Sequence, residues 1–563
     1  MANFTLIWGL ILSLMGCQLA PQKKSVTRVG HIDQQVVFSL ITLEKLDSKE
    51  NLTAALEPYS HMMESARFVS SRKEGGMHVT MVDAFLKEGF QAEKVVETLE
   101  KDQKIGFASL NYVYEGEAFD EAYLDAGDIK DPSLERQHHH IVMQNKEAWK
   151  ISMGEGIVVA VTDMGVDTAH EDLVENLWKN IGELGLDDDG NLKMTNGVDD
   201  DENGYIDDYQ GWDTTSQDGS NDPSTSHSHG THIAGIIAAS INDIGIVGTA
   251  PKAAVLPIKF AGQGVWNSLD VARAYTYASV NGAKIINTSF RIDQYVDDKV
   301  YLNAIKDTYM AGVLIFNSAG NAGMKNPQRQ AFEHILLVAN TVSDGADYDT
   351  KSPSSNYGWG IDISAPGTRI LSTVAQGRYA AMSGTSMAAP NAAAAAALIW
   401  SKNPEWTKEQ VVAMLFSGAL DIDERNKKYA GQLGSGRVDS LASLIEDLPA
   451  PRVAGLLVSE LNRRSKKIIL TLDSVLDPES VDISKISLFE IVDGEEIQIP
   501  LTLVKPYALG SNRLIFELQN ENILGTGTFK FVLDKSVLDP FGQGLDGDSS
   551  GDGPSDYIET FEI

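Results

Sequence analysis

The sequence predicts a central α/β domain built on a doubly wound, mostly parallel sheet in three layers, with an α+β segment before it and a β-sandwich after it. Three observations predict this order. The central part contains unbroken apolar runs that end in glycine turns, as strands buried on both faces do. Residues 18–130 mix strand-like pieces with a helical run. Residues 448–563 alternate short strands with turn residues.

The composition narrows the class of protein. The chain has 563 residues, with 46 basic and 79 acidic side chains and a net charge of −33. So acidic a chain is not expected to bind nucleic acid, and it is typical of a soluble, exported protein that tolerates calcium. The single cysteine, Cys17, excludes a disulfide within the chain. No organic cofactor is expected.

Residues 1–17 indicate export. The apolar stretch 4–15 is short for a bilayer span, and Leu-Met-Gly-Cys, ending at Cys17, resembles the lipobox of bacterial lipoproteins. The resemblance implies a signal peptide, a lipid on Cys17 that binds the membrane and, from Gln18, an outer-membrane or cell-surface location. Because no Lys or Arg precedes the apolar core, an uncleaved anchor stays open as an alternative.

Residues 18–130 include a helical run over Ala92–Lys101 and a strand-like run over Gly106–Tyr114. The stretch Asp120–Gln137 is acidic and poor in apolar residues, which indicates a linker open to cleavage. The histidines at 138–140 are interpreted as a packed or solvated segment, with a metal site as the alternative.

The α/β domain, residues 131–447, begins its sheet with the apolar run Ile157–Val161. Asp163 follows at the carboxyl end of this expected strand. Ligand and catalytic sites of open α/β sheets lie at that end, so the carboxylate is well placed for chemistry. A turn or a helix cap is the alternative role for Asp163.

His229 opens the segment GTHIAGIIAAS, whose small and apolar residues recur at helical spacing. We expect a helix packed closely on the sheet, with the imidazole at its amino end. His232 lies three residues on, so a metal-binding pair is the alternative, but no Glu stands between the two as a zinc-protease motif requires.

Ser386 lies directly before the run Ala392–Ala397, which predicts a central buried helix. A serine at the amino end of a helix lies among free backbone N–H groups, which favour developing negative charge. A plain helix cap is the alternative. A serine hydroxyl becomes a nucleophile when an imidazole takes its proton and a carboxylate orients that imidazole.

The segments VVAVTDMGVD, HSHGTHIAG and MSGTSMAAP carry Asp163, His229 and Ser386 in that order, and they resemble the subtilisin-like serine proteases (subtilase family, peptidase S8) over roughly residues 130–445. The resemblance implies that Ser386 attacks, His229 moves the proton and Asp163 orients His229. It also implies a substrate-binding strand at Ser289. Residues 18–130 would then be a propeptide that inhibits the enzyme.

A further apolar run, Val313–Phe316, leads into NSAGNAG and resembles the oxyanion segment of that family. By this match Asn321 supplies the side-chain amide that stabilises the oxyanion, and Gly320 borders the substrate. Phe290 and Arg291 continue the substrate strand. Arg291 stands where relatives usually have Gly, so its guanidinium could attract an acidic side chain near the scissile bond.

The acidic loop between Asp187 and Asp222 predicts a structural calcium site. Residues at the offsets of an EF-hand loop are its candidate ligands. Position 12 of that loop is Gln210 where Glu is usual, so a solvated acidic loop is the alternative. The candidate ligands are Asp199, Asp201, Asn203, Tyr205 through its carbonyl, and Asp207.

Residues 448–563 follow a Pro-rich boundary and contain short strand-like runs separated by turn residues, which predicts a β-sandwich. The module resembles bacterial immunoglobulin-like domains appended to secreted enzymes. The sequence therefore predicts an exported serine endopeptidase that acts on proteins or peptides, released extracellularly if its propeptide is cut. An esterase or amidase, or a surface binding protein whose protease serves only its own maturation, stays open.

Overall fold

The structure is a computed structural model that describes residues 27–562 except 47, 75, 116–123, 126–133, 216–220, 262–264, 446–447, 449, 463–464, 473, 504–512 and 519–526. The expected signal peptide with Cys17, and most of the expected linker, lie outside the described residues. Among the described residues, no helix combines the length and apolar character of a bilayer span.

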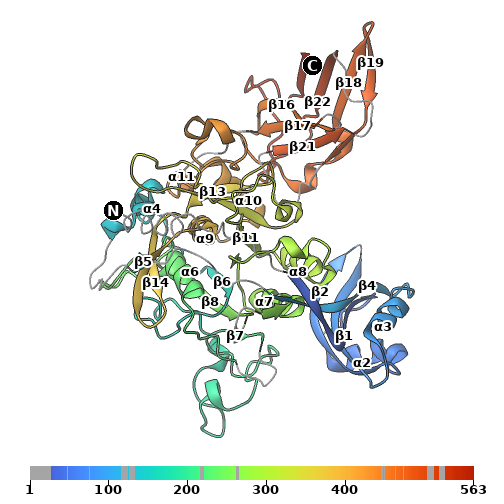
Figure 1. The fold of residues 1–563 in the computed structure, drawn as a ribbon, viewed down its shortest axis with the longest axis vertical. Coiled ribbons are helices and arrows are strands. Elements are labelled where there is room, and N and C mark those ends of the chain that lie inside the picture. Colours follow the sequence, from blue (N-terminus) through green and yellow to red (C-terminus); the bar gives the residue numbers. More distant parts are fainter. Residues whose placement is uncertain are drawn as a thin grey trace, which may run out of the picture.

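A seven-stranded parallel sheet forms the centre of the molecule (Figure 1). In the sheet, β6 is followed by β8 and then β7 on one side and by β10, β11, β12 and β13 on the other, so the strand order reverses next to β6. This reversal is where α/β sheets place their sites. The strands are β6 (Val158–Asp163), β7 (Trp212–Asp213), β8 (Ala254–Lys259), β10 (Ile285–Thr288), β11 (Leu314–Ser318), β12 (Leu336–Thr341) and β13 (Ile363–Pro366).

Helices cover both faces of this sheet because alternate strand residues point to opposite sides. Val159 and Val161 pack with α6 (Ser228–Ala238), α9 (Thr385–Lys402) and α10 (Lys408–Ser417) in one core, whereas Ala160 packs in the other core with α7 (Ser268–Val280) and α8 (Lys299–Met310). The predicted α/β fold with a mostly parallel central sheet is confirmed. Short helices complete the domain: α4 (His138–Val142), α5 (Asn145–Ala148) and α11 (Ala442–Ile445).

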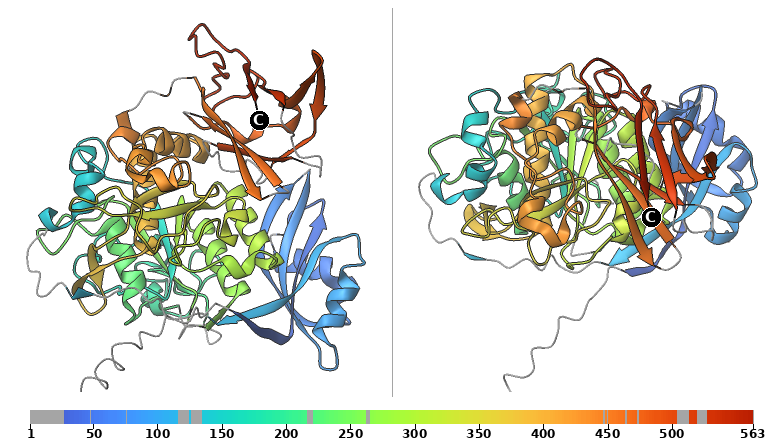
Figure 2. Two further views of the ribbon diagram at one scale, coloured as in Figure 1. Left: turned by 45° about the horizontal axis from the view of Figure 1, so that its top comes forward. Right: turned by 90° about the horizontal axis from the view of Figure 1, so that it is seen from above.

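The amino-terminal part is an antiparallel sheet that lies on α7 and α8 (Figures 1 and 2). Its helices α2 (Lys49–Leu56) and α3 (Ala92–Leu99) pack in a core of their own, whereas Val37, Val69 and Met81 join the core around α7 and α8. The sheet order is β2 (Met63–Glu74), β3 (Met77–Leu86), β1 (Thr27–Thr42), β4 (Ile105–Glu115) and β9 (Val265–Asn267).

Two strand pairs join this part to the central domain. Val113–Glu115 of β4 pairs with β9, which belongs to the central domain by sequence. A short strand, β5 (Leu124–Asp125), pairs with β15 (Arg378–Met382), which itself pairs with β14 (Ile370–Val374). Pairings so far apart in sequence leave no local signal, and the sequence analysis did not predict them.

The carboxyl-terminal part consists of two antiparallel four-stranded sheets that share one apolar core. Phe516 and Phe531 meet across this core with ring centroids 5.7 Å apart. Trp406, near the start of α10, packs on Phe541 and ties this part to the central domain. One sheet contains β16 (Val453–Asn462), β17 (Ser465–Leu472), β21 (Arg513–Leu518) and β20 (Leu501–Leu503), and the other contains β19 (Glu495–Ile499), β18 (Ile486–Val492), β22 (Thr528–Leu533) and β23 (Tyr557–Glu562).

Candidate active site

Asp163 and His229 form a buried pair at the carboxyl end of β6. The Nδ1 atom of His229 lies 2.8 Å from Oδ2 of Asp163, and the two side chains are 3% and 1% exposed. A carboxylate accepts only, so the ring proton lies on Nδ1 and Nε2 is left as the basic nitrogen. The second carboxylate oxygen, Oδ1, accepts the backbone N–H of Met164 at 2.8 Å.

The close approach of α6 to β6 depends on Gly230. A Cβ atom there would lie 2.2 Å from the carbonyl oxygen of Gly165 and 3.0 Å from Cβ of Asp163. Any larger residue would push the first turn of α6, and with it His229, away from the aspartate. His232 does not share the site, because burial lowers its pKa to about 3 and its Nε2 faces the carbonyl of Ala380 at 3.2 Å.

Ser386 lies in the first turn of α9 and is 3% exposed. Its hydroxyl donates to the carbonyl oxygen of Ser289 at 3.1 Å, and the Ser289 hydroxyl donates to the carbonyl of Ser386 at the same distance. This reciprocal pair fixes the segment after β10 beside the amino end of α9. The Ser289 end of the expected substrate strand and the expected nucleophile therefore lie side by side.

Asn321 extends from the glycine turn after β11 toward the same helix end. Its Oδ1 accepts the N–H and the hydroxyl of Thr385, both at 2.9 Å. The acceptor oxygen is thereby engaged, and the exposed amide turns its N–H donors to the other side. Asn317 has a different role, since its buried amide donates to the carbonyls of Thr288 and Phe290 and joins β10 to β11.

Phe290 and Arg291 follow Ser289 along the expected substrate strand. The Phe290 ring is buried against Phe260, with ring centroids 4.6 Å apart. The Arg291 side chain is 40% exposed, and its Nε lies 3.9 Å from Oδ2 of Asp293. Gly320 has φ +98°, and a Cβ there would lie 2.5 Å from Nδ2 of Asn356, so only glycine fits this turn beside the site.

The acidic loop gathers a set of oxygens different from the one its spacing predicts. Glu183, Asp201 and Asp208 bring carboxylate oxygens within 4.8 Å of one another. The Oε2 of Glu183 is buried and has no hydrogen-bond partner among the described residues. Burial and the neighbouring carboxylates raise the pKa of Glu183 to about 7.

The predicted ligands divide between this cluster and the backbone of the loop. Asn203 lies beside the cluster, with its Nδ2 3.2 Å from Oδ2 of Asp208. Asp199 instead accepts N–H groups of its own turn, Asp207 accepts the N–H of Gly197, and the Tyr205 ring packs on Tyr277. The EF-hand spacing did not include Glu183, because this residue lies outside the acidic run. The turn at Ile181–Glu183 brings it to the carboxylate cluster.

Two of the three histidines at 138–140 are packed, whereas His138 is exposed. His139 and His140 are buried with ring centroids 4.1 Å apart, and Nε2 of His140 lies 2.9 Å from the carbonyl of Val247. Burial lowers the pKa of His140 to about 4. These contacts agree with a packed segment.

Residues 154–440 match the model of the subtilase family, Peptidase_S8. The chain belongs to the subtilase family. It is 34% identical over 272 residues to thermitase of Thermoactinomyces vulgaris, which covers 47% of this chain and 83% of that protein. As a member of this family the chain is a subtilisin-like serine protease, a hydrolase.

Two more relatives show the same level of identity. Subtilisin Savinase of Lederbergia lenta is 34% identical over 227 residues, covering 39% of this chain and 80% of that protein. An extracellular protease of Xanthomonas campestris is 34% identical over 283 residues, covering 46% of each chain.

Proposed function

We propose that this subtilase is an endopeptidase whose catalytic triad is Asp163, His229 and Ser386. The observation that carries the proposal is the buried 2.8 Å hydrogen bond between Asp163 and Nδ1 of His229. That bond orients the ring and leaves Nε2 to accept the serine proton. Ser386, in the first turn of a long helix, is held beside the substrate strand.

The same contacts support a sequence of steps. When an extended peptide binds, one of its N–H groups donates to the Ser289 carbonyl in place of the Ser386 hydroxyl. The Ser386 hydroxyl then turns to His229. The hydroxyl attacks the peptide carbonyl while His229 removes its proton, and the oxyanion binds the Asn321 amide and the Ser386 N–H. His229 returns the proton to the leaving amine, and water hydrolyses the acyl-enzyme by the same route.

Casein hydrolysis tests this proposal. Purified wild-type chain should degrade casein, and Ser386→Ala should not, because the attacking oxygen is gone. Ser228→Ala, which removes a hydroxyl from the first turn of α6 and leaves the three triad side chains in place, is the control and should stay active. Hydrolysis of ester substrates only would favour an esterase. Activity confined to the chain's own cleavage would favour a surface binding protein that matures itself.

We further propose that residues 18–130 are a propeptide that inhibits the enzyme. Support comes from β4 and β5, which flank residues 116–123 in the sequence and pair with β9 and with β15. β15, the partner of β5, ends at Met382, four residues before Ser386 in the sequence. The Ser386→Ala chain is therefore expected to stay full length. Its cleavage near residues 120–140 without another protease would exclude self-processing.

A structural calcium ion is proposed for the cluster of Glu183, Asp201 and Asp208, with the Asn203 side chain beside it. The three carboxylates fit, because calcium prefers carboxylate oxygens. The buried Oε2 of Glu183 needs a positive partner, since an unpaired buried carboxylate is costly. When bound, calcium would neutralise the mutual repulsion of these carboxylates and hold the loop together.

Export is proposed as well, with a lipid on Cys17 that anchors the precursor to the outer membrane or cell surface. The support is the lipobox-like sequence and the likeness to a relative named as an extracellular protease. Cleavage of the propeptide would leave the lipid behind and release the enzyme. Mass spectrometry of the amino terminus of the secreted product tests both points.

A further inference from the structure

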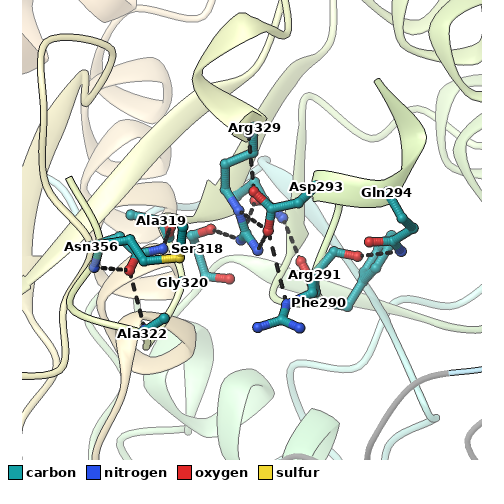
Figure 3. Close-up of polar contacts among 12 residues, drawn as sticks. Phe290, Arg291, Asp293, Gln294, Ser318, Ala319, Gly320, Ala322, Arg329 and Asn356 are labelled. Atoms are coloured by element: carbon teal, nitrogen blue, oxygen red, sulfur yellow. Dashed lines mark hydrogen bonds and ion pairs between the residues drawn. The ribbon is translucent and has the colours of Figure 1, made fainter. Parts of the chain in front are cut away.

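Asn321 lies in a turn after β11, residues 319–324, which is called the oxyanion turn below. One buried side chain holds its backbone. Asn356 is 3% exposed, and its Nδ2 donates to the carbonyl of Ala319 at 2.8 Å while its Oδ1 accepts the N–H of Ala322 at 3.1 Å (Figure 3). Because the same amide bonds the turn on both sides of Asn321, we expect the turn to shift as one unit.

Arg329 holds the residues from which the oxyanion turn leaves β11. Its side chain is 2% exposed, and Nη1 donates to the carbonyl of Ser318 and, at 3.3 Å, to Oδ1 of Asn317. The guanidinium also lies 3.4 Å from the place where a Cβ of Gly320 would stand. Arg329 therefore packs directly behind the oxyanion turn, and the position of the guanidinium sets the position of Asn321.

Asp293 fixes the guanidinium from the other side. Its Oδ2 accepts Nε and Nη2 of Arg329 at 3.1 and 2.5 Å, and its Oδ1 accepts the backbone N–H of Arg329 at 3.1 Å. Charge-assisted hydrogen bonds of this kind orient the planar guanidinium. Burial alone would raise the pKa of Asp293, but Arg329 and Arg291 together hold it below its usual value. Figure 3 shows the Arg329 guanidinium between Asp293 and Ser318.

The two segments that Arg329 joins are those whose separation matters for the chemistry. Asp293 stands four residues after Ser289, whose carbonyl contacts the Ser386 hydroxyl at 3.1 Å. The oxyanion turn carries Asn321. An oxyanion donor acts only when it lies about 2.7–3.1 Å from the developing charge, and a displacement of about 1 Å can cost on the order of 100-fold in rate. A bridge between the two segments therefore bears directly on turnover.

We propose that Arg329 is a positioning residue: held by Asp293 and bonded to the Ser318 carbonyl, it places the Asn321 amide within reach of the oxyanion. This inference rests on the proposed endopeptidase function. Arg329 is buried behind the turn and does not contact the substrate, so its effect reaches the reaction through Asn321. Loss of Arg329 should therefore slow the reaction without abolishing it.

A double-mutant cycle with Asn321 tests the inference. Arg329→Met removes every N–H donor of the side chain and keeps an unbranched chain in its place. The kcat of the purified full chain on a peptide substrate should fall on the order of tenfold. In the Asn321→Asp background the same change should lower kcat by less than about twofold, because the donor that Arg329 positions is already gone. Equal losses in the two backgrounds would overturn the inference.

A second variant separates positioning from stability. Arg329→Met leaves Asp293 without its buried cation, which should lower the melting temperature. The double variant Arg329→Met/Asp293→Asn removes both charges of the pair, so its melting temperature should return toward that of the wild type. Its kcat should stay low, because the Ser318 carbonyl still lacks its donor. Recovery of kcat together with the melting temperature would show that Arg329 only stabilises the fold, and would overturn the inference.

Arg437→Met/Asp349→Asn is the matched control. Arg437 is 4% exposed, its Nε donates to Asp349 at 2.9 Å, and its Nη1 donates to the carbonyl of Val438 at 2.9 Å. This buried pair has the same chemistry, but it lies beside β13, at the edge of the central sheet. The control should keep the kcat of the wild type, and a tenfold loss there as well would count against a specific role of Arg329. Failure of the wild type to cut any peptide would overturn the proposed function, whereas the other outcomes bear on Arg329 alone.

Discussion

At the scale of single residues, Asn321 is the position where a catalytic role and a structural role can be separated most clearly. Asn321→Asp keeps Oδ1, which accepts from Thr385, and replaces the N–H donor by a second oxygen. We expect kcat to fall at least on the order of 10²-fold, the lower end of the loss seen when such a donor is removed from a subtilisin, with little change in melting temperature.

Asn317→Ala is the contrasting variant for this measurement. Its buried amide holds the carbonyls of Thr288 and Phe290, so its loss should lower the melting temperature first. If Asn321→Asp retained wild-type kcat on peptide substrates, the oxyanion role of Asn321 would have to be abandoned.

At the scale of elements, the acidic loop predicts a response to calcium. Removal of calcium with a chelator should lower the melting temperature by several degrees, because an ion held at 100 times its dissociation constant contributes about 2.7 kcal/mol. Glu183→Gln should abolish this response. Without calcium the variant should be more stable than the wild type, since one of three mutually repelling carboxylates is neutral.

Asp187→Asn is the control for the loop. Asp187 belongs to the same acidic run, but its carboxylate accepts N–H groups of Asn191 and Asn196 and lies outside the cluster. It should retain the calcium response. An unchanged response in Glu183→Gln, with loss in Asp207→Asn, would favour the EF-hand spacing over the cluster.

The elements also differ in how far the sequence predicts them. Strands β6 and β11 are buried on both faces, so their apolar runs identify them, and the helix over the alanine run is equally plain. Glu183 joins Asp208 only through a turn, and Arg329 meets Asp293 across 36 residues. Such contacts depend on the tertiary fold, and no local spacing records them.

At the scale of the whole molecule, the amino-terminal part covers α7 and α8 through ion pairs of unequal burial. Arg273 of α7 donates to Asp83 at 2.6 Å, and the Asp83 side chain is fully buried under it. Lys299 and Glu100 also pair at 2.6 Å, but both remain nearly half exposed. Removal of the partner of a buried charge costs far more than removal of an exposed one.

This difference predicts how tightly the proposed propeptide, once cut, stays bound to the enzyme. Arg273→Ala leaves Asp83 buried against the enzyme without its cation, which costs about 3 kcal/mol and should weaken the complex on the order of 100-fold. The two fragments should then separate on gel filtration at concentrations where the wild-type fragments elute together, and protease activity should emerge sooner. Lys299→Ala should elute as the wild type does. If both variants behaved alike, the exposed and the buried ion pair would contribute equally to the complex. The burial of Asp83 would then not be what holds the proposed propeptide on the enzyme.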